Sequence, residues 1–427
     1  MWSKGNLCHR PVAADVQRRG GILKIIERYS RLRIPEGSGD FLFGRPGRIF
    51  RLKATVTIAF CIGLIMSSRL WIGPRSYPLA PVFSILPPLP YPLDCFLFAA
   101  LFALAALIVI LPKPQGFIGA FLVIVLVSCL LDQTRWQPWV YLYSFLLATL
   151  ALFSWDNADA AGQKRALNIA RLIVASTYVF SGLQKINSNF IESDFPWIVQ
   201  PITNMLPWLA SPIRLLGVSA PFIQVGFGVG LLIGKYRRIS LILAVSMHVF
   251  ILAMLGPLGH DWNSIVWPWT AAMAVFDIVL FSDTEKFTPR EIFWARGNRY
   301  QVAVVLLFAI LPFLSFFNLW DSYLSAALYS GNLTEAEIYV SDMGRDALPE
   351  AVKQRLVHTS PNTNILNIQR WAIEDLNVMP YPETRVYKKI ANDICQQAQT
   401  PTQIVLIVRE QRMFWSKPET GYRCLDL

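Results

Sequence analysis

The sequence predicts a mainly α-helical bundle that crosses a membrane many times, followed by a small C-terminal α/β domain outside the membrane. Three observations predict this fold. Of the 427 residues, 54% are hydrophobic and only 16% are charged, whereas ordinary soluble domains have about 25% charged residues. The mean hydropathy is positive, at +0.41. Apolar runs close to the length of a membrane span recur from residue 54 to residue 319 and then stop.

The apolar runs predict nine membrane-spanning helices. Several are shorter than the roughly 20 residues of a typical span, so one short pair could instead be re-entrant. Between the runs, residues 73–93 are rich in proline and are expected to be extended, and residues 187–216 combine proline with tryptophan, which favours the membrane interface. The predicted spans are residues 54–72, 94–111, 116–132, 138–154, 166–186, 217–234, 239–256, 264–281 and 301–319.

The net charge of +11 indicates membrane orientation, and no nucleic-acid partner is predicted. Residues 1–53 contain 12 Lys and Arg residues against four Asp and Glu residues, and the basic residues between spans concentrate in every second loop. Such loops stay in the cytoplasm, so we expect the N-terminus inside and the C-terminus outside, with a bacterial inner membrane as the default location. The basic residues of these loops are Lys113, Lys164, Arg165, Lys235, Arg237, Arg238, Lys286, Arg290, Arg296 and Arg299.

These patterns divide the chain into three regions. We expect a basic cytoplasmic segment at residues 1–53, the helical bundle at 54–319 and an extracytoplasmic α/β domain at 320–427. Within the last region, alternation of apolar and polar residues predicts strands, and a period of 3.6 predicts helices. The expected strands are 335–341 and 403–408, and the expected helices are 350–356, 365–376 and 383–398.

The six cysteines have neither a CxxC motif nor the spacing of a zinc site, so no metal site is predicted. Cys395 and Cys424 both lie in the C-terminal region. In an oxidising compartment they could form a disulfide, which stabilises a fold by about 2–4 kcal/mol. Two unpaired buried thiols are the alternative.

A polar stripe ends the fifth predicted span. Tyr178, Ser181, Gly182 and Lys185 are three or four residues apart, which places them on one face of a helix. A lysine in a confined apolar pocket can act as a base. Alternatively, Lys185 extends its amine to the lipid headgroups and has no further role.

Other polar side chains fall at span ends. Asp132 and Arg135 can pair at i,i+3, followed by Trp136; we expect either a structural clamp or an anchor for an anionic or quinone-like headgroup. Asp277 and Arg171 are expected to pair near the cytoplasmic side.

Two histidines complete the candidate residues. His248, in mid-span, is expected to be neutral and hydrogen-bonded within the bundle. His260, Asp261 and Asn263 begin the eighth span at the same outer level as Asp132, Arg135, Lys185 and Asn187. Acid, base and amide groups at one level indicate a pocket open to the outside or to the outer lipid layer, covered by the C-terminal domain.

Three segments resemble the horizontally transferred transmembrane (HTTM) family, which includes the vitamin K-dependent gamma-carboxylases. The first is Tyr178-Val-Phe-Ser-Gly-Leu-Gln-Lys-Ile-Asn187, and the second runs from Asp132-Gln-Thr-Arg-Trp136 to Tyr141-Leu-Tyr143. The third combines Met247-His248 with Trp267-Pro268-Trp269. Together they cover a region from about residue 50 to residue 320.

The resemblance implies a helical bundle with a lipid-quinone pocket and a lysine directed into it. Lys185 matches the carboxylase lysine that deprotonates vitamin K hydroquinone, so a reduced quinone is the implied cofactor. Two departures oppose full gamma-carboxylation: Trp139 stands where the carboxylase has a histidine, and the chain after the last span is too short for the large lumenal region of the carboxylase.

Two functions from different classes therefore remain. The first is a quinol-dependent oxidoreductase or carboxylase-like membrane enzyme, with Lys185 as base assisted by His260 or Asp261 in an outer-leaflet pocket. The alternative is a non-catalytic membrane scaffold or accessory subunit. Its polar stripe would only hold helices together, and its extracytoplasmic domain would bind a protein partner.

Overall fold

The computed structural model describes most of the chain after residue 46. Residues 1–46 of the predicted cytoplasmic segment lie outside the described residues. Lys286 and Arg296 also lie outside them. The described ranges are 47–153, 160–283, 285, 287–294, 298–346, 348–398, 401–412 and 415–427.

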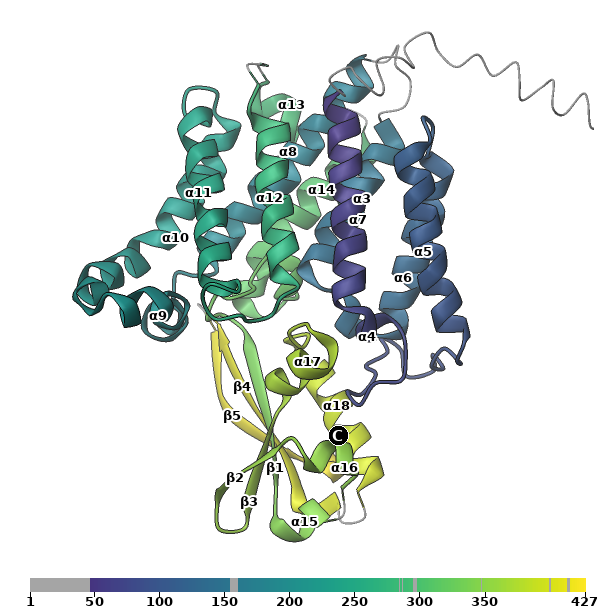
Figure 1. Ribbon diagram of the computed structural model, residues 1–427, viewed down its shortest axis with the longest axis vertical. Helices are drawn as coiled ribbons and strands as arrows, with labels where there is room; N and C mark the ends of the chain where they lie inside the picture. The colour runs from purple at the N-terminus through teal and green to yellow at the C-terminus, as the bar shows by residue number, and fades with distance from the viewer. Residues whose placement is uncertain are drawn as a thin grey trace, which may run out of the picture. The chain divides into compact units, whose positions relative to one another are not determined.

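The first part of the described chain is helical. Long helices run side by side, and their loops gather at the two ends of the bundle (Figure 1). Short helices α4, α9 and α13 lie in the connections. The helices are α3 (Arg48–Met66), α4 (Ser68–Trp71), α5 (Leu93–Ile110), α6 (Gln115–Leu131), α7 (Pro138–Phe153), α8 (Ala160–Leu183), α9 (Phe195–Met205), α10 (Ala210–Leu232), α11 (Arg237–Leu255), α12 (Val266–Phe281), α13 (Pro289–Phe293) and α14 (Arg299–Val305).

The chain is a polytopic helical membrane protein, as its composition predicts. Within the described residues, six helical segments are long and apolar enough to cross a membrane, and three shorter apolar helices, α6, α7 and α12, lie among them. The last segment, Arg299–Phe317, begins as α14 and continues through π-helical and 3₁₀ turns.

Helices α8 and α10 pack closely because glycines lie where their backbones approach. A side-chain carbon added at Gly182 would lie 2.8 Å from the Pro221 carbonyl oxygen, and one added at Gly228 would lie 3.0 Å from the Val179 backbone nitrogen. Small residues allow such approaches between membrane helices. The pair α8 and α10 is therefore held at a fixed separation.

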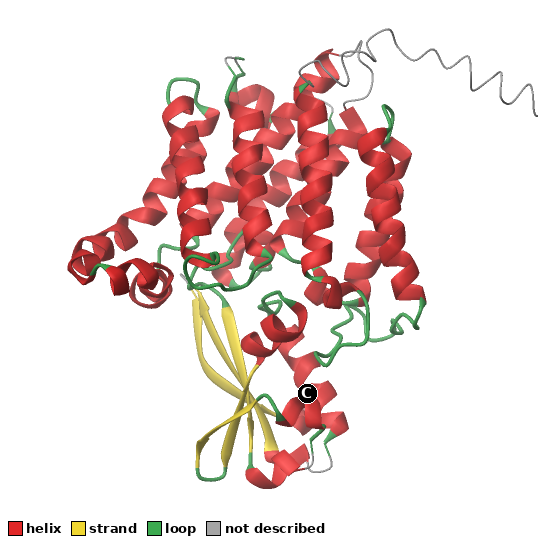
Figure 2. Cartoon of the chain, viewed as in Figure 1, coloured by secondary structure: helices red, strands yellow, loops and turns green. Residues whose placement is uncertain are grey.

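The remainder of the chain forms a five-stranded antiparallel sheet of order β2-β3-β1-β4-β5 with helices beside it (Figure 2). Two of the five strands, β1 and β4, were expected from the sequence. The expected helix at 365–376 begins only at residue 368, because the preceding residues pair as β3. The elements are β1 (Thr334–Val340), α15 (Asp342–Asp346), α16 (Glu350–Lys353), β2 (Leu356–Ser360), β3 (Thr363–Asn367), α17 (Ile368–Leu376), α18 (Thr384–Gln397), β4 (Ile404–Arg412) and β5 (Trp415–Arg423).

A disulfide joins Cys395 and Cys424, the first of the two alternatives for these cysteines. It ties the C-terminal end of α18 to the turn after β5, across a sequence separation of 29 residues. Closing this loop restricts the unfolded chain and so stabilises the sheet region.

Several hydrogen bonds attach the sheet region to the helical bundle, and two groups of them lie near the candidate residues. The Asp375 carboxylate accepts hydrogen bonds from the backbone amides of Ser76 and Tyr77 at 2.8 and 2.7 Å, and thereby holds the proline-rich loop 73–93. In the other group, the Asn187 side chain donates to the Ser330 carbonyl oxygen at 2.7 Å. Beside it, Gly331 has a φ of +65°, and a side chain there would collide with the Phe190 backbone nitrogen.

Candidate functional site

A cavity of about 510 Å³, which we call the membrane cavity, opens among α8, α10, α11 and α12. Its volume falls in the range of roughly 300–1,000 Å³ that is usual for small-molecule sites. Its wall is mostly aliphatic and aromatic, with a few polar side chains. The lining residues are Thr177, Tyr178, Ser181, Lys185, Phe190, Phe195, Ile198, Leu216, Ala220, Ile223, Gln224, Phe227, Leu243, Ser246, Met247, His248, Phe250, Ile251, Leu255, Val266, Trp269, Thr270, Met273, Ala326, Leu328 and Tyr329.

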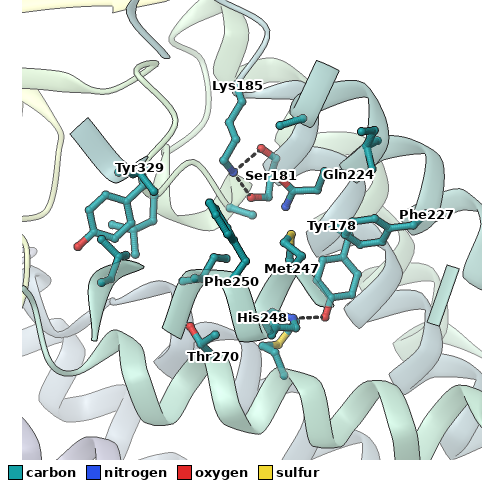
Figure 3. Close-up of a pocket in the computed structure, with 18 of the residues that line it drawn as sticks. Tyr178, Ser181, Lys185, Gln224, Phe227, Met247, His248, Phe250, Thr270 and Tyr329 are labelled. Carbon is teal, nitrogen blue, oxygen red and sulfur yellow. Dashed lines mark hydrogen bonds between the residues drawn. The ribbon is translucent and has the colours of Figure 1, made fainter. Parts of the chain in front are cut away.

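The polar stripe of α8 faces this cavity. Tyr178, Ser181 and Lys185 all line it, as the helical spacing predicts (Figure 3). Gly182 instead faces α10 and sets the approach of that helix. Tyr178 and Ser181 are about 4.5 Å apart along the axis of α8, and Lys185, beyond the end of α8 at Leu183, bonds back to Ser181. The cavity therefore has two polar positions on one wall.

Lys185 follows the last turn of α8. Its amine donates two hydrogen bonds to Ser181, one to the carbonyl oxygen at 2.9 Å and one to the hydroxyl oxygen at 2.7 Å. The nitrogen also lies 5.9 Å from the centre of the Phe190 ring. A neutral amine has two N–H groups and one lone pair. When Ser181 accepts both N–H groups, the lone pair of Lys185 is left for a ligand in the cavity.

Tyr178, His248 and Asp277 form a buried hydrogen-bonded cluster at the second polar position. The Tyr178 hydroxyl donates to Asp277 Oδ2 at 2.7 Å and lies 2.7 Å from His248 Nε2. Because the hydroxyl has one hydrogen, its bond to Asp277 assigns the Nε2 hydrogen to His248. Among the described residues, His248 Nδ1 and Asp277 Oδ1 have no hydrogen-bond partner. The cluster keeps unused hydrogen-bonding capacity.

Asp277 is a residue whose role the sequence did not reveal. Its expected partner, Arg171, lies 3.3 Å from Glu285 and 3.4 Å from Asp283, while Asp277 accepts from Tyr178. The expected pair is therefore wrong, because the rotation of α12 turns Asp277 towards α8. A lone carboxylate in an apolar run was the signal that could have marked it.

Asp132 and Arg135 lie outside the membrane cavity. Asp132 is fully buried, 2.6 Å from the Arg75 guanidinium and 3.9 Å from that of Arg135. Arg135 donates to the carbonyl oxygens of Leu70 and Ser128 at 2.9 and 3.0 Å. These contacts join helix ends, and we call the group the Asp132 clamp; Arg75 and Arg135 also line a separate cavity of about 460 Å³. Trp136, next in the chain, packs against the hydrophobic core.

The pKa of Asp132 reflects this pairing. Burial alone would raise the pKa, but Arg75 and Arg135 attract the carboxylate and hold its pKa below the ordinary value of 3.8. The aspartate therefore stays ionised as part of the clamp.

Asn187 and Asn263 serve the loops around the membrane cavity. Asn187 accepts a hydrogen bond from the Phe190 backbone amide at 2.9 Å and shapes the turn that follows Lys185. Asn263 donates to the Tyr329 hydroxyl at 2.9 Å and so positions one residue of the cavity wall.

His260 and Asp261 do not reach the membrane cavity. His260 stacks on Trp197 with ring centres 4.3 Å apart, and its Nε2 lies 2.6 Å from the Trp197 carbonyl oxygen. It lines a second cavity, next to the sheet. Asp261 is exposed in a left-handed turn. The structure thus brings together Lys185, Ser181, Tyr178 and His248, and it separates them from His260, Asp261, Asp132 and Arg135. Within the described chain, no group of three or more His, Cys, Asp or Glu side chains could hold a metal ion.

Comparison with known protein families gives one match. Residues 166–256 match the model of the DoxX family. This segment includes most of α8 and all of α9, α10 and α11, and so it supplies most of the wall of the membrane cavity. No curated protein and no solved structure matches the chain.

The match corrects the resemblance to the HTTM family. The segment Tyr178–Asn187, which carries that resemblance, lies inside the DoxX match, and no HTTM domain is found. A short pattern of aromatic, small and basic residues on a helix face arises wherever a polar stripe borders a cavity, so it does not identify a family. The expectation of vitamin K-dependent carboxylase chemistry has no further support.

Proposed function

We propose that the protein binds a lipid-soluble hydroquinone in the membrane cavity and that Lys185 accepts a proton from its hydroxyl group. One observation carries the proposal: a mostly apolar cavity within the helical bundle has an amine at one polar position and a hydroxyl–imidazole–carboxyl cluster at the other. An apolar tail matches the wall, and ring hydroxyl groups match the polar positions.

The proton step follows from the hydrogen bonds of Lys185. When the amine is neutral, Ser181 accepts both of its N–H groups, and the lone pair can take the hydroxyl proton. The O–H bond of the hydroquinone breaks, an N–H bond forms on Lys185, and an ion pair of phenolate and ammonium results. The anion of a hydroquinone is oxidised more easily than the neutral molecule. Binding the anion would therefore favour a quinol-dependent oxidation.

A lipophilic nitrophenol with an alkyl chain tests this step, because its phenolate absorbs at a longer wavelength than the phenol. Bound to the purified full-length protein, the probe should absorb as the phenolate below the pH at which it ionises in solution. On Lys185→Met it should bind but absorb as the phenol. Lys235→Met, an exposed lysine in the α10–α11 connection, is the matched control and should behave as wild type.

Two results would overturn the proposal. One is a probe that absorbs as the phenol on the wild-type protein, and the other is an unchanged phenolate band on Lys185→Met. Thermal unfolding of each variant checks that it is folded. Mass spectrometry of lipids bound to the purified protein adds an independent measurement, since a reduced quinone supports the proposal and phospholipid alone favours a scaffold that binds a protein partner through its C-terminal region.

We further propose that the six long apolar segments and the three shorter apolar helices all cross a bacterial inner membrane. The N-terminal side would lie in the cytoplasm and the sheet outside. The α5–α6 and α10–α11 connections lie at the end of the bundle away from the sheet (Figure 1), and they contain Lys113 and Lys235, which supports this orientation. An impermeant thiol reagent should label Met343→Cys in intact cells and Lys235→Cys only after lysis; the reverse pattern contradicts the orientation.

A further inference from the structure

A second cavity of about 460 Å³ lies where the sheet meets the helical bundle, and we call it the junction cavity. Tyr329 lines it on one side and the membrane cavity on the other, so this tyrosine forms part of the wall between them. The lining residues are Ser193, Asp194, Trp197, His260, Trp262, Tyr323, Tyr329, Gly331, Leu333, Thr334, Glu335, Ala336, Glu337, Asn367, Gln369, Met379, Pro380, Pro382, Tyr387 and Arg409.

Aromatic rings form one wall of the junction cavity. Trp197 stacks on His260 and, with ring centres 6.4 Å apart and planes 20° from parallel, on Tyr329. Trp262 meets Trp197 edge-on at 6.1 Å. The faces of tryptophan and tyrosine rings attract cations, and groups of such rings are the usual site for quaternary ammonium ions.

Carboxylates line the same cavity. Glu337 pairs with Arg409 at 3.0 Å, so its charge is compensated. Asp194 and Glu335 have no salt bridge within 4 Å among the described residues, although Lys185 attracts Asp194 and Arg409 attracts Glu335 from farther away. The described lining has three carboxylates and one guanidinium group, and this excess of negative charge beside aromatic rings favours a cationic ligand.

A buried hydroxyl adds a second, independent indication. Tyr323 lines the junction cavity and is only 1% exposed, and its hydroxyl has no hydrogen-bond partner among the described residues. A buried polar atom left unpaired costs about 1–3 kcal/mol. A hydroxyl on the ligand would relieve this cost.

We propose that the junction cavity binds a small organic cation, an ammonium group that carries a hydroxyl. The ammonium group lies beside the aromatic wall of Trp197, Trp262 and Tyr329. It is attracted by Asp194 and Glu335, and the hydroxyl pairs with Tyr323. The proposal does not rest on the hydroquinone proposed for the membrane cavity.

Choline and its neutral isostere 3,3-dimethylbutan-1-ol test this site by isothermal titration calorimetry on the purified full-length protein. The two probes have the same shape, and only choline is charged. Choline should bind at least about tenfold more tightly than the isostere, because the carboxylates act on charge alone. Dihexanoyl phosphatidylcholine has the same ammonium group, but its choline oxygen is esterified to phosphate, so this lipid tests a headgroup as the source of the cation. Binding of this lipid without binding of choline would assign the site to a headgroup and contradict the contact between a ligand hydroxyl and Tyr323.

Variants then locate the binding. Glu335→Gln, an exposed position that the fold tolerates, should weaken binding of the cationic probe by roughly fivefold. Glu350→Gln, an exposed acid of α16 that does not line the cavity, should leave it unchanged. Equal binding of choline and its isostere, absence of binding of both choline and the lipid, or equal effects of the two variants would each overturn the proposal.

Discussion

Two buried polar clusters of this protein differ in the contacts that hold them together. In the Asp132 clamp, the carboxylate has two guanidinium groups within 4 Å, and Arg135 donates to backbone carbonyl oxygens as well. In the cluster of Tyr178, His248 and Asp277, two hydrogen bonds of 2.7 Å meet at one hydroxyl. The second cluster borders the membrane cavity, whereas Arg75 and Arg135 of the clamp line a different cavity of about 460 Å³.

The difference lies in the kind of contact that holds each cluster together. The Asp132 clamp is held by ion pairs with one positive charge in excess, and its Arg75 Nε and Asp132 Oδ2 have no hydrogen-bond partner among the described residues. His248 Nδ1 and Asp277 Oδ1 have no partner in the described chain, and His248 lines the membrane cavity. Charge and hydrogen-bonding capacity left open beside a cavity are what a bound molecule can use.

The largest expected effect is on the clamp. Asp132→Asn removes the negative charge between Arg75 and Arg135 and leaves two buried guanidinium groups uncompensated. Breaking a buried ion pair in this way costs about 3–5 kcal/mol. We therefore expect a large fall in the denaturation midpoint of the purified protein. Asp261→Asn, at an exposed position, is the control and should have little effect.

The second cluster should be less critical for stability. Tyr178→Phe leaves Asp277 and His248 without their shared hydroxyl, which costs about 1–3 kcal/mol. Thermal unfolding should show a smaller loss of stability than for Asp132→Asn. Binding of the nitrophenol probe should weaken. A loss of stability equal to that of Asp132→Asn, with unchanged probe binding, would make this cluster a second clamp. Tyr236→Phe, at an exposed tyrosine, is the matched control.

The contrast also shows what the sequence could predict. Helical spacing on a single element placed Tyr178, Ser181 and Lys185 on one face, and apolar runs located the helices with starts that differ by up to seven residues. The level of Asp132 in the membrane was inferred in the same way, but its separation from Lys185 depends on how different helices pack. The contact between Tyr178 and Asp277 depends on the rotation of two helices, which periodicity does not report.

The sheet was less predictable than the helices for a different reason. Strand β1 alternates between buried and more exposed residues, which gives the expected period of two. Strand β2 at the edge of the sheet is mostly exposed and lacks this pattern. The junction cavity was not predictable, because Asp194 and Glu335 are far apart in the sequence and meet only through the attachment of the sheet to the bundle.

The smallest expected effect concerns two carboxylates: Asp132, which has a salt bridge, and Asp194, which has none among the described residues. The guanidinium groups hold the pKa of Asp132 below its usual value, whereas burial and the neighbouring Glu335 raise the pKa of Asp194 to about 6, against the opposing effects of the Gly331 amide and Lys185. Asp194 therefore gains a proton between pH 7 and pH 5, while Asp132 does not.

Choline binding in the junction cavity should follow the ionised form of Asp194, and so it should strengthen as the pH rises through about 6. We expect affinity at pH 5 to be roughly threefold lower than at pH 7.5, since one of two attracting charges is lost. The other charged or titratable groups facing Asp194 are Glu335, Glu337, Arg409, Lys185 and His260, and Asp194→Asn separates their effect from its own. That variant should bind weakly at both pH values. If it keeps the wild-type pH dependence, another of these groups controls binding, and the unpaired carboxylate of Asp194 is not the charge that the cation uses.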